Sequence, residues 1–166
     1  AEDALCFASG MAAISSATLA CVKSGDHIVA VRNCYGPQYS FMSSYLARFG
    51  VTVTFVAGER VEDFIEATQD NTTLFYLESP TSINFRLQDL SAIAKFAKSK
   101  GIFTLIDNSW ATPIYQQPIT LGIDAVLHSA SKYLGGHSDI VAGVLCGSKE
   151  FIARVQGQER AMLGGI

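Results

Sequence analysis

The sequence of 166 residues predicts an α/β protein in which helices sandwich a mostly parallel sheet. Short apolar runs alternate with segments whose apolar residues recur at helical spacing, which is typical of strand–helix–strand units. Polar clusters directly follow several of these runs. The length suits one domain or a piece of one, and we expect a fragment, because the chain starts in mid-pattern at Ala1 and residues 163–166 add no terminal element.

Each element is predicted from the spacing of its apolar residues. Strands are predicted where short runs are almost wholly apolar or alternate in polarity, at residues 27–31, 51–56, 73–78, 102–106, 125–127 and 141–146. Helices are predicted where apolar residues lie three and four positions apart, at residues 11–21, 39–49, 61–68 and 90–100 and from residue 151 to 156. No internal repeat or low-complexity stretch interrupts this alternation.

Small residues and proline mark the boundaries of the first elements. Ser9 and Gly10 precede the first helix and are typical of a helix start. The Gly36–Pro37 pair predicts a turn before the second helix, and Gly50 is expected to end that helix.

Composition excludes several classes of function. The net charge is −3 without a basic block, which argues against a nucleic-acid partner. No signal peptide and no apolar run of about 18 residues is present, which argues against a membrane segment. The cysteines have neither metal spacing nor a CxxC motif, and His128 and His137 lack a third ligand at metal spacing, so no metal site is predicted. We expect buried thiols in a reducing, cytoplasmic compartment for these cysteines: Cys6, Cys21, Cys34 and Cys146.

Three polar clusters are expected to form one site. They follow predicted strands as Glu78-Ser79-Pro80, Asp107-Asn108-Ser109 and Ser129-Ala130-Ser131-Lys132. Because ligands of open parallel sheets bind outside the carboxyl ends of the strands, the three clusters should converge there.

Three side chains suggest the chemistry of this site. Lys132 comes just after a buried strand, and desolvation would lower its pKa and make its amine a nucleophile or base, although a solvated loop lysine is the alternative. Asp107 ends a buried strand, where a cationic ring nitrogen would satisfy its carboxylate; a loop cap is the alternative. Tyr35 is able to stack on a flat ring or to serve as an ordinary turn aromatic.

A phosphate site is predicted beside these groups. Ser9, Gly10 and Met11 open a helix whose first N–H groups suit a phosphate, or form an ordinary cap. Ser129 and Ser131 would add hydroxyl donors. A phosphate, a cationic aromatic ring and a lysine-reactive aldehyde in one ligand describe pyridoxal 5′-phosphate.

The sequence also resembles a known family. The segments FASGMAAI, CYG, LESP, IDNSWATP and HSASKYLGGHSD, in order between Phe7 and Gly147, are similar to the fold-type I pyridoxal-phosphate enzymes of cysteine and methionine metabolism. The resemblance implies that residues 1–166 form an aspartate-aminotransferase-like large domain, without the family's N-terminal segment and C-terminal small domain. It implies a Schiff base on Lys132, a ring-nitrogen partner in Asp107, and Tyr35 stacked on the ring. Ser9 stands beside the residues that would hold the phosphate, which are Gly10, Met11, Ser129 and Ser131.

The resemblance further implies a lyase that acts on a sulfur amino acid and assembles as a homotetramer, a dimer of dimers with shared active sites. Many family members have Asn-Pro where this chain has Ser82-Ile83, and together with Trp110 this is more similar to bacterial cystathionine β-lyases. We therefore expect β-elimination of cystathionine to homocysteine, pyruvate and ammonia. The alternative is γ-elimination or γ-replacement, as in cystathionine γ-lyase, methionine γ-lyase and cystathionine γ-synthase.

Other classes of function stay open at this point. Ser129 to Lys132 also match S-x-x-K, the acyl-enzyme motif of penicillin-binding proteins, but the K-T-G strand of that class is absent. The absence of GxGxxG argues against a nicotinamide dehydrogenase. A non-catalytic fragment that only packs against partners is a third possibility. Glu78 is expected to make a structural hydrogen bond, and Asn84 to lie near the ring or in a turn.

Overall fold

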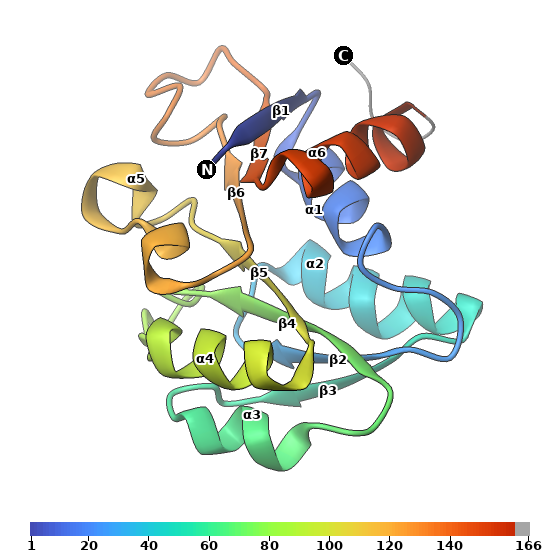
Figure 1. Ribbon diagram of the computed structural model, residues 1–166. Coiled ribbons are helices and arrows are strands. Elements are labelled where there is room, and N and C mark those ends of the chain that lie inside the picture. The colour runs from blue at the N-terminus through green and yellow to red at the C-terminus, as the bar shows by residue number, and fades with distance from the viewer. Residues whose placement is uncertain (162–166) are drawn as a thin grey trace.

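The computed structural model describes residues 1–161, so the expectation drawn from residues 163–166 lies outside it. The strands are β1 (Asp3–Phe7), β2 (His27–Val31), β3 (Thr52–Val56), β4 (Thr72–Glu78), β5 (Phe103–Asp107), β6 (Ala125–Ser129) and β7 (Gly143–Gly147). They form one sheet in the order β1-β7-β6-β5-β4-β2-β3 (Figure 1). The five strands β2, β3, β4, β5 and β6 are parallel to one another, while β7 is antiparallel to both β6 and β1. The mostly parallel sheet is therefore confirmed.

Helices cover both faces of the sheet. They are α1 (Gly10–Leu19), α2 (Gly36–Ser40), α3 (Val61–Ala67), α4 (Leu90–Lys100), α5 (Thr112–Tyr115) and α6 (Lys149–Val155). α1 and α2 contact each other on one face, and α3 and α4 contact each other on the opposite face (Figure 1). α6 packs against β1 and β7.

Several boundaries differ from the sequence prediction. The turn predicted at Gly36–Pro37 is wrong, because α2 begins at Gly36. Pro37 lies in the first turn of this helix, where backbone N–H groups have no helical partner, so its lack of an N–H costs no hydrogen bond. The helix continues through a π-helical turn and a 3₁₀ turn until Gly50, whose φ of 77° ends it. The last predicted strand starts too early, since β7 begins at Gly143 and Val141 is exposed. β1 was not predicted, because only Leu5 and Phe7 of this strand are buried and its apolar pattern is short.

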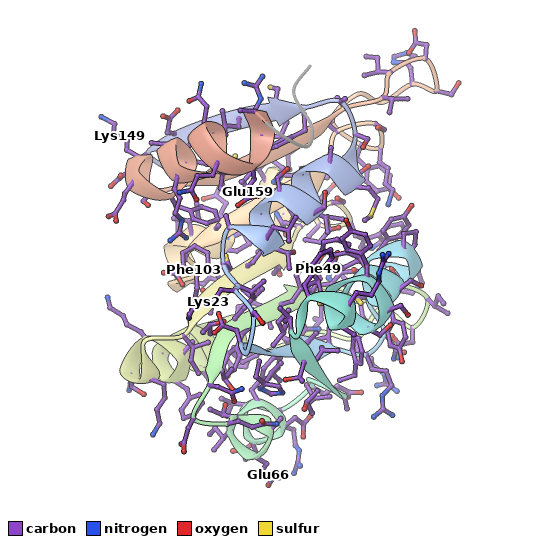
Figure 2. All side chains as sticks on the ribbon, turned by 90° about the vertical axis from the view of Figure 1, so that its right-hand side faces the viewer. Lys23, Phe49, Glu66, Phe103, Lys149 and Glu159 are labelled. Atoms are coloured by element: carbon purple, nitrogen blue, oxygen red, sulfur yellow. The ribbon has the colours of Figure 1, made fainter. Side chains whose placement is uncertain are left out.

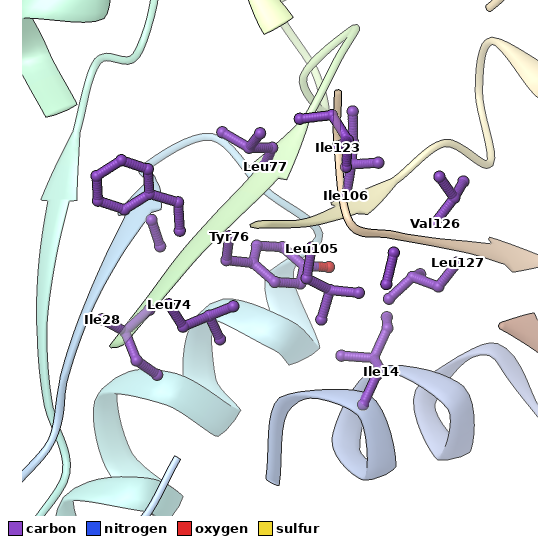
Figure 3. Close-up of a cluster of buried hydrophobic side chains, with 14 of the residues drawn as sticks. Ile14, Ile28, Leu74, Tyr76, Leu77, Leu105, Ile106, Ile123, Val126 and Leu127 are labelled. Atoms are coloured by element: carbon purple, nitrogen blue, oxygen red, sulfur yellow. The ribbon is translucent and has the colours of Figure 1, made fainter. Parts of the chain in front are cut away.

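The core explains why the site lies where it does. Tyr76 of β4 and Leu105 of β5 are paired in register and fully buried. Figure 3 shows Ile14 of α1 pointing toward Leu105 and Leu127. Burying a large apolar side chain in this way stabilises the fold by about 1.5–3 kcal/mol. Because strand side chains alternate, the next residues on this α1-facing side lie two positions farther on, at the carboxyl ends of β4, β5 and β6.

The surface is charged and carries one exposed thiol. Lys23, Glu66 and Lys149 extend into solvent (Figure 2). All four cysteines are free, and Cys34 is buried, but Cys6 is exposed, so the expectation of uniformly buried thiols is wrong. Among residues 1–161, no helix has the length and apolar content needed to cross a membrane.

Candidate active site

The carboxyl ends of three neighbouring strands bring the predicted polar clusters together. Glu78 ends β4 and is paired in register with Asp107, which ends β5. Asp107 in turn lies beside Leu127 of β6, two residues before Ser129. The expected convergence of the three clusters is therefore confirmed by the strand register.

A cavity of about 210 Å³ lies where α1 begins. We call it the α1 cavity. All of the residues predicted for catalysis and cofactor binding line it: Ser9, Gly10, Met11, Tyr35, Asp107, Ser129, Ser131 and Lys132. Ile14 and Val141 complete its walls and were not predicted, because apolar side chains carry no chemical motif.

A second cavity, of about 230 Å³, has three wall residues in common with the first. We call it the loop cavity, because the segment after β4 forms much of its wall. The residues common to both cavities are Tyr35, Asp107 and Lys132. Its remaining walls are formed by Glu78, Pro80, Thr81, Ser82, Ile83, Phe85, Ser109 and Trp110. A ligand that occupied both cavities would pass directly between the three predicted catalytic side chains.

Lys132 and Tyr35 lie close together at this boundary. The Lys132 Nζ atom is 5.2 Å from the centre of the Tyr35 ring, within the range of a cation–π interaction. Lys132 is exposed, so the sequence argument that burial activates this lysine is wrong. The reason is that β6 ends at Ser129, and Lys132 lies on a turn three residues beyond the buried strand. Its role must therefore depend on position rather than on desolvation.

Asp107 is buried, with only 6% of the residue exposed. Its Oδ1 atom accepts a hydrogen bond of 2.9 Å from the backbone N–H of Ser109, which is the loop-capping contact foreseen as the alternative. Burial raises the pKa of Asp107, while the Ser109 hydrogen bond and the charge on Lys132 act to lower it. A cationic ligand at this carboxylate would offset the cost of its burial.

The start of α1 is shaped for close approach. The Ser9 hydroxyl accepts a hydrogen bond of 3.1 Å from the N–H of Ala12 and so caps the helix. A Cβ atom on Gly10 would lie 2.9 Å from both Cβ and Oγ of Ser129, so glycine is needed for the helix start to approach β6. The free N–H groups of the first turn and the helix dipole suit an anion.

The two serines after β6 differ in their availability. The Ser129 hydroxyl lies against Gly10. The Ser131 hydroxyl instead donates to the carbonyl of Ala142 (3.2 Å) and accepts from the N–H of Ala142 (2.9 Å). The single proton of Ser131 is thus engaged with the backbone, and Ser129 is the better placed of the two to donate to an anion in the α1 cavity.

Ser109 joins two strand ends, a role the sequence did not reveal. Its N–H donates to Asp107, and its Oγ accepts a hydrogen bond of 2.6 Å from the N–H of Ser129. The DNS segment marked Ser109 as part of a polar cluster, but the contact with Ser129 depends on two strands that are distant in sequence.

The lesser candidates have structural roles. Glu78 accepts hydrogen bonds from the N–H of Tyr35 (2.7 Å) and from the hydroxyl of Ser82 (2.6 Å), which confirms that it makes structural hydrogen bonds. Asn84 serves the turn, because its Oδ1 accepts a hydrogen bond of 2.6 Å from the hydroxyl of Thr81. His128 is buried, and burial lowers its pKa.

The cofactor-free protein should lose stability as pH rises from about 5 to about 7. Burial and the neighbouring Asp107 charge raise the pKa of Glu78 from its usual 4.5 to about 7. A carboxyl group whose pKa is higher in the folded protein than in the unfolded chain stabilises the fold. This stabilisation is fully present below the pKa of the unfolded chain and is lost as pH rises through the pKa of the folded protein. The shift corresponds to about 3 kcal/mol. Glu78→Gln should remove the part of this loss that Glu78 contributes, as measured by urea unfolding at pH 5 and pH 8.

The comparison between the two proteins isolates the effect of Glu78. Asp107, whose pKa burial also raises, acts in the same direction as Glu78, and His27 and His128, whose pKa values burial lowers, act in the opposite direction, but all three are present in both proteins. Glu66→Gln, at an exposed helical position, should retain the wild-type pH dependence. An identical pH dependence in Glu78→Gln and wild type would contradict the prediction.

Comparison with known proteins gives consistent matches across the chain. A family profile described as "Cys/Met metabolism PLP-dependent enzyme" matches residues 1–165. An L-methionine gamma-lyase of Porphyromonas gingivalis is 43% identical over 156 residues, which are 93% of this chain and 39% of the relative. A cystathionine gamma-lyase of Bacillus subtilis is 45% identical over 150 residues, which are 90% of this chain and 39% of the relative.

Solved structures agree with this result. The crystal structure of metB from Corynebacterium glutamicum superposes with a TM-score of 0.94 at 36% identity, over 98% of this chain and 42% of that chain. The chain spans about two fifths of the length of these relatives. At this identity and similarity, the expected fold type I architecture is confirmed.

Proposed function

We propose that the protein is a carbon–sulfur lyase acting at the γ-carbon of sulfur amino acids, from the premise that the chain belongs to the family of Cys/Met metabolism PLP-dependent enzymes. The observation that carries the proposal is the position of Tyr35, Asp107 and Lys132 on the boundary between two cavities. The similarity to proteins named as methionine and cystathionine γ-lyases supports the γ-position and the substrate class.

The residues present fit pyridoxal 5′-phosphate. A buried carboxyl with a raised pKa, Asp107, suits the cationic ring nitrogen. The start of α1, which approaches β6 only because Gly10 has no Cβ, suits the phosphate together with the hydroxyl of Ser129. Lys132 would hold the aldehyde carbon covalently, and the Tyr35 ring would cover one face of the cofactor.

When bound, the cofactor supplies an electron sink for negative charge at the substrate α-carbon. Once the substrate amino group has displaced it, the amine of Lys132 would take the proton from Cα. In a γ-elimination it would give that proton back to the cofactor-bound substrate before taking a second proton from Cβ. Asp107 would hold a proton at the ring nitrogen. Positioned proton transfer of this kind contributes about 10²–10⁴-fold to the rate. The turn that carries Lys132 places its amine beside Tyr35, where both cavities meet.

We propose elimination at the γ-carbon in preference to the β-elimination that Ser82-Ile83 and Trp110 suggest. The two relatives named above share more than two fifths of their aligned residues with this chain, and both are named as γ-lyases. We keep β-elimination as the second candidate, because Ser82, Ile83 and Trp110 line the loop cavity and so lie where they would affect a substrate. γ-Replacement is the third candidate and differs in giving a new thioether instead of an oxo acid.

The oxo acid released from cystathionine distinguishes these candidates. γ-Elimination gives 2-oxobutyrate, ammonia and cysteine, whereas β-elimination gives pyruvate, ammonia and homocysteine. We expect the holoenzyme to release 2-oxobutyrate, measured by chromatography of the oxo acids. Pyruvate as the main oxo acid would instead establish β-elimination. Lys132→Ala serves as the control for release that does not depend on the site.

We further propose a homotetramer, a dimer of dimers, in the cytoplasm. Large apolar side chains are exposed at the loop cavity, namely Ile83 (92%) and Trp110 (50%), and Tyr115 (87%) lies with Trp110 on the wall of a neighbouring cavity. Contiguous apolar surface of this kind is typical of a region that another polypeptide covers. Free cysteines, one of them exposed, support a reducing compartment.

A further inference from the structure

Glu78 makes a separate contact with each of its carboxylate oxygens. Its Oε2 atom accepts a hydrogen bond of 2.7 Å from the backbone N–H of Tyr35, and its Oε1 atom accepts one of 2.6 Å from the hydroxyl of Ser82. Both distances lie within the range of good hydrogen bonds. Glu78 therefore connects a residue that follows β2 with a residue in the loop after β4.

The two partners of Glu78 lie on the walls of the proposed site. Tyr35 lines both cavities and lies 5.2 Å, measured from its ring centre, from the Lys132 amine. Ser82 lines the loop cavity, beside exposed Ile83. Tyr35 precedes α2 and has no side-chain capping contact of its own. The Tyr35 backbone is held on its carbonyl side by the N–H of Tyr39 (3.0 Å) and on its N–H side by Glu78, so Glu78 is the side chain that fixes this residue at the start of α2.

The position of Glu78 is unfavourable for stability. Its side chain is buried, with 7% exposure, and it is paired in register with the buried carboxyl of Asp107. Two carboxyl groups held side by side away from water destabilise each other's charged forms. Residues that lower the stability of the folded protein in this way are typical of functional sites.

We propose that Glu78 is a positioning residue that holds Tyr35 against the cofactor ring and orients the Ser82 hydroxyl on the wall of the loop cavity. This inference rests on the proposed function. While the Ser82 proton is directed at Glu78, Ser82 offers only lone pairs to a ligand. Ser82 thus accepts from a substrate N–H group and does not donate to a substrate carboxylate.

Two substitutions separate the length of the Glu78 side chain from its charge. Glu78→Gln removes the charge but keeps the length, so its amide oxygen can accept from Tyr35 while its NH₂ group donates to Ser82. Glu78→Asp keeps the charge but is one methylene shorter and cannot reach both partners. The holoenzymes are compared by circular dichroism in the visible cofactor band, by cofactor affinity, and by borohydride fixation of the cofactor on Lys132.

We expect Glu78→Gln to keep the dichroism band and a cofactor dissociation constant within threefold of wild type. Glu78→Asp should lose at least half of the band and bind the cofactor about tenfold more weakly, with the label still on Lys132. Glu66→Gln, at an exposed position, should match wild type. Equal behaviour of the Gln and Asp variants, or a loss in the Gln variant alone, would overturn the proposal.

Ser82→Ala provides the second variant if Glu78→Asp does not fold. It leaves the Tyr35 contact intact, so we expect an unchanged dichroism band, an unchanged kcat and a KM for the amino acid raised about fivefold. An unchanged KM would contradict the assigned role of the Ser82–Glu78 contact. Failure of the wild-type protein to fix the cofactor on Lys132 would instead contradict the proposed function, so the two failures are distinguishable.

Discussion

Lys132→Ala should abolish both turnover and covalent attachment of pyridoxal phosphate. Lys132 is the lysine on the boundary of the two cavities, with its amine 5.2 Å from the centre of the Tyr35 ring. An alanine there removes the group that would hold the aldehyde and that would take the Cα proton. No neighbouring cation of the cavity walls replaces it within residues 1–161.

The turn that carries Lys132 is built from the backbone, so the substitution should leave it intact. The N–H of Lys132 bonds to the carbonyl of Ser129 (3.1 Å), and the N–H of Gly136 bonds to the carbonyl of Lys132 (2.8 Å). Gly136 has a φ of 71°, which glycine adopts without strain. Loss of function in Lys132→Ala therefore reports on the amine rather than on folding.

The measurement combines a spectrum with peptide mapping. Pyridoxal phosphate is added, the visible band is recorded, borohydride is added, and the labelled peptide is identified by mass. Lys149→Ala, at a surface lysine, should label like wild type (Figure 2). A borohydride-stable label retained in Lys132→Ala would exclude the assignment. A label on a longer form of the protein but not on this chain would mean that further segments complete the pocket.

The sequence predicted the strand ends of the site well, and the reason is local. Each of β4, β5 and β6 consists of a buried run followed directly by polar residues, and this pattern is visible without knowing the neighbours. The same holds for α4, whose predicted bounds agree with the structure because Gly101 follows it in the left-handed region. Local patterns of polarity therefore located both the sheet edge and the cluster of groups on it.

The sequence could not predict properties that depend on distant segments. The exposure of Lys132 follows from how the turn after β6 leaves the sheet. The hydrogen bond between Glu78 and Tyr35 joins residues 43 positions apart, and no pattern in either segment predicts it. The choice between β- and γ-elimination could not be made from the sequence for a related reason, since Ser82-Ile83 is a short motif in a loop whose contacts depend on other segments.

Asp107→Asn should lower kcat at least a thousandfold, which is about 4 kcal/mol of transition-state free energy. Asparagine has nearly the same shape, and its side-chain oxygen can still accept the N–H of Ser109. It lacks the negative charge that keeps a ring nitrogen protonated, so the cofactor would lose much of its capacity to accept electrons. The substitution thus removes charge and preserves packing.

Stability measurements separate this effect from damage to the fold. Because burial raises the pKa of Asp107, its charged form is costly in the cofactor-free protein, and Asp107→Asn should melt at the wild-type temperature or above. The matched control is Asp89→Asn, at the N-cap of α4, where asparagine caps a helix as well as aspartate does. It should leave both kcat and melting temperature unchanged. A loss of less than tenfold in Asp107→Asn would exclude the ring-nitrogen role, because a contact with Ser109 alone survives the substitution.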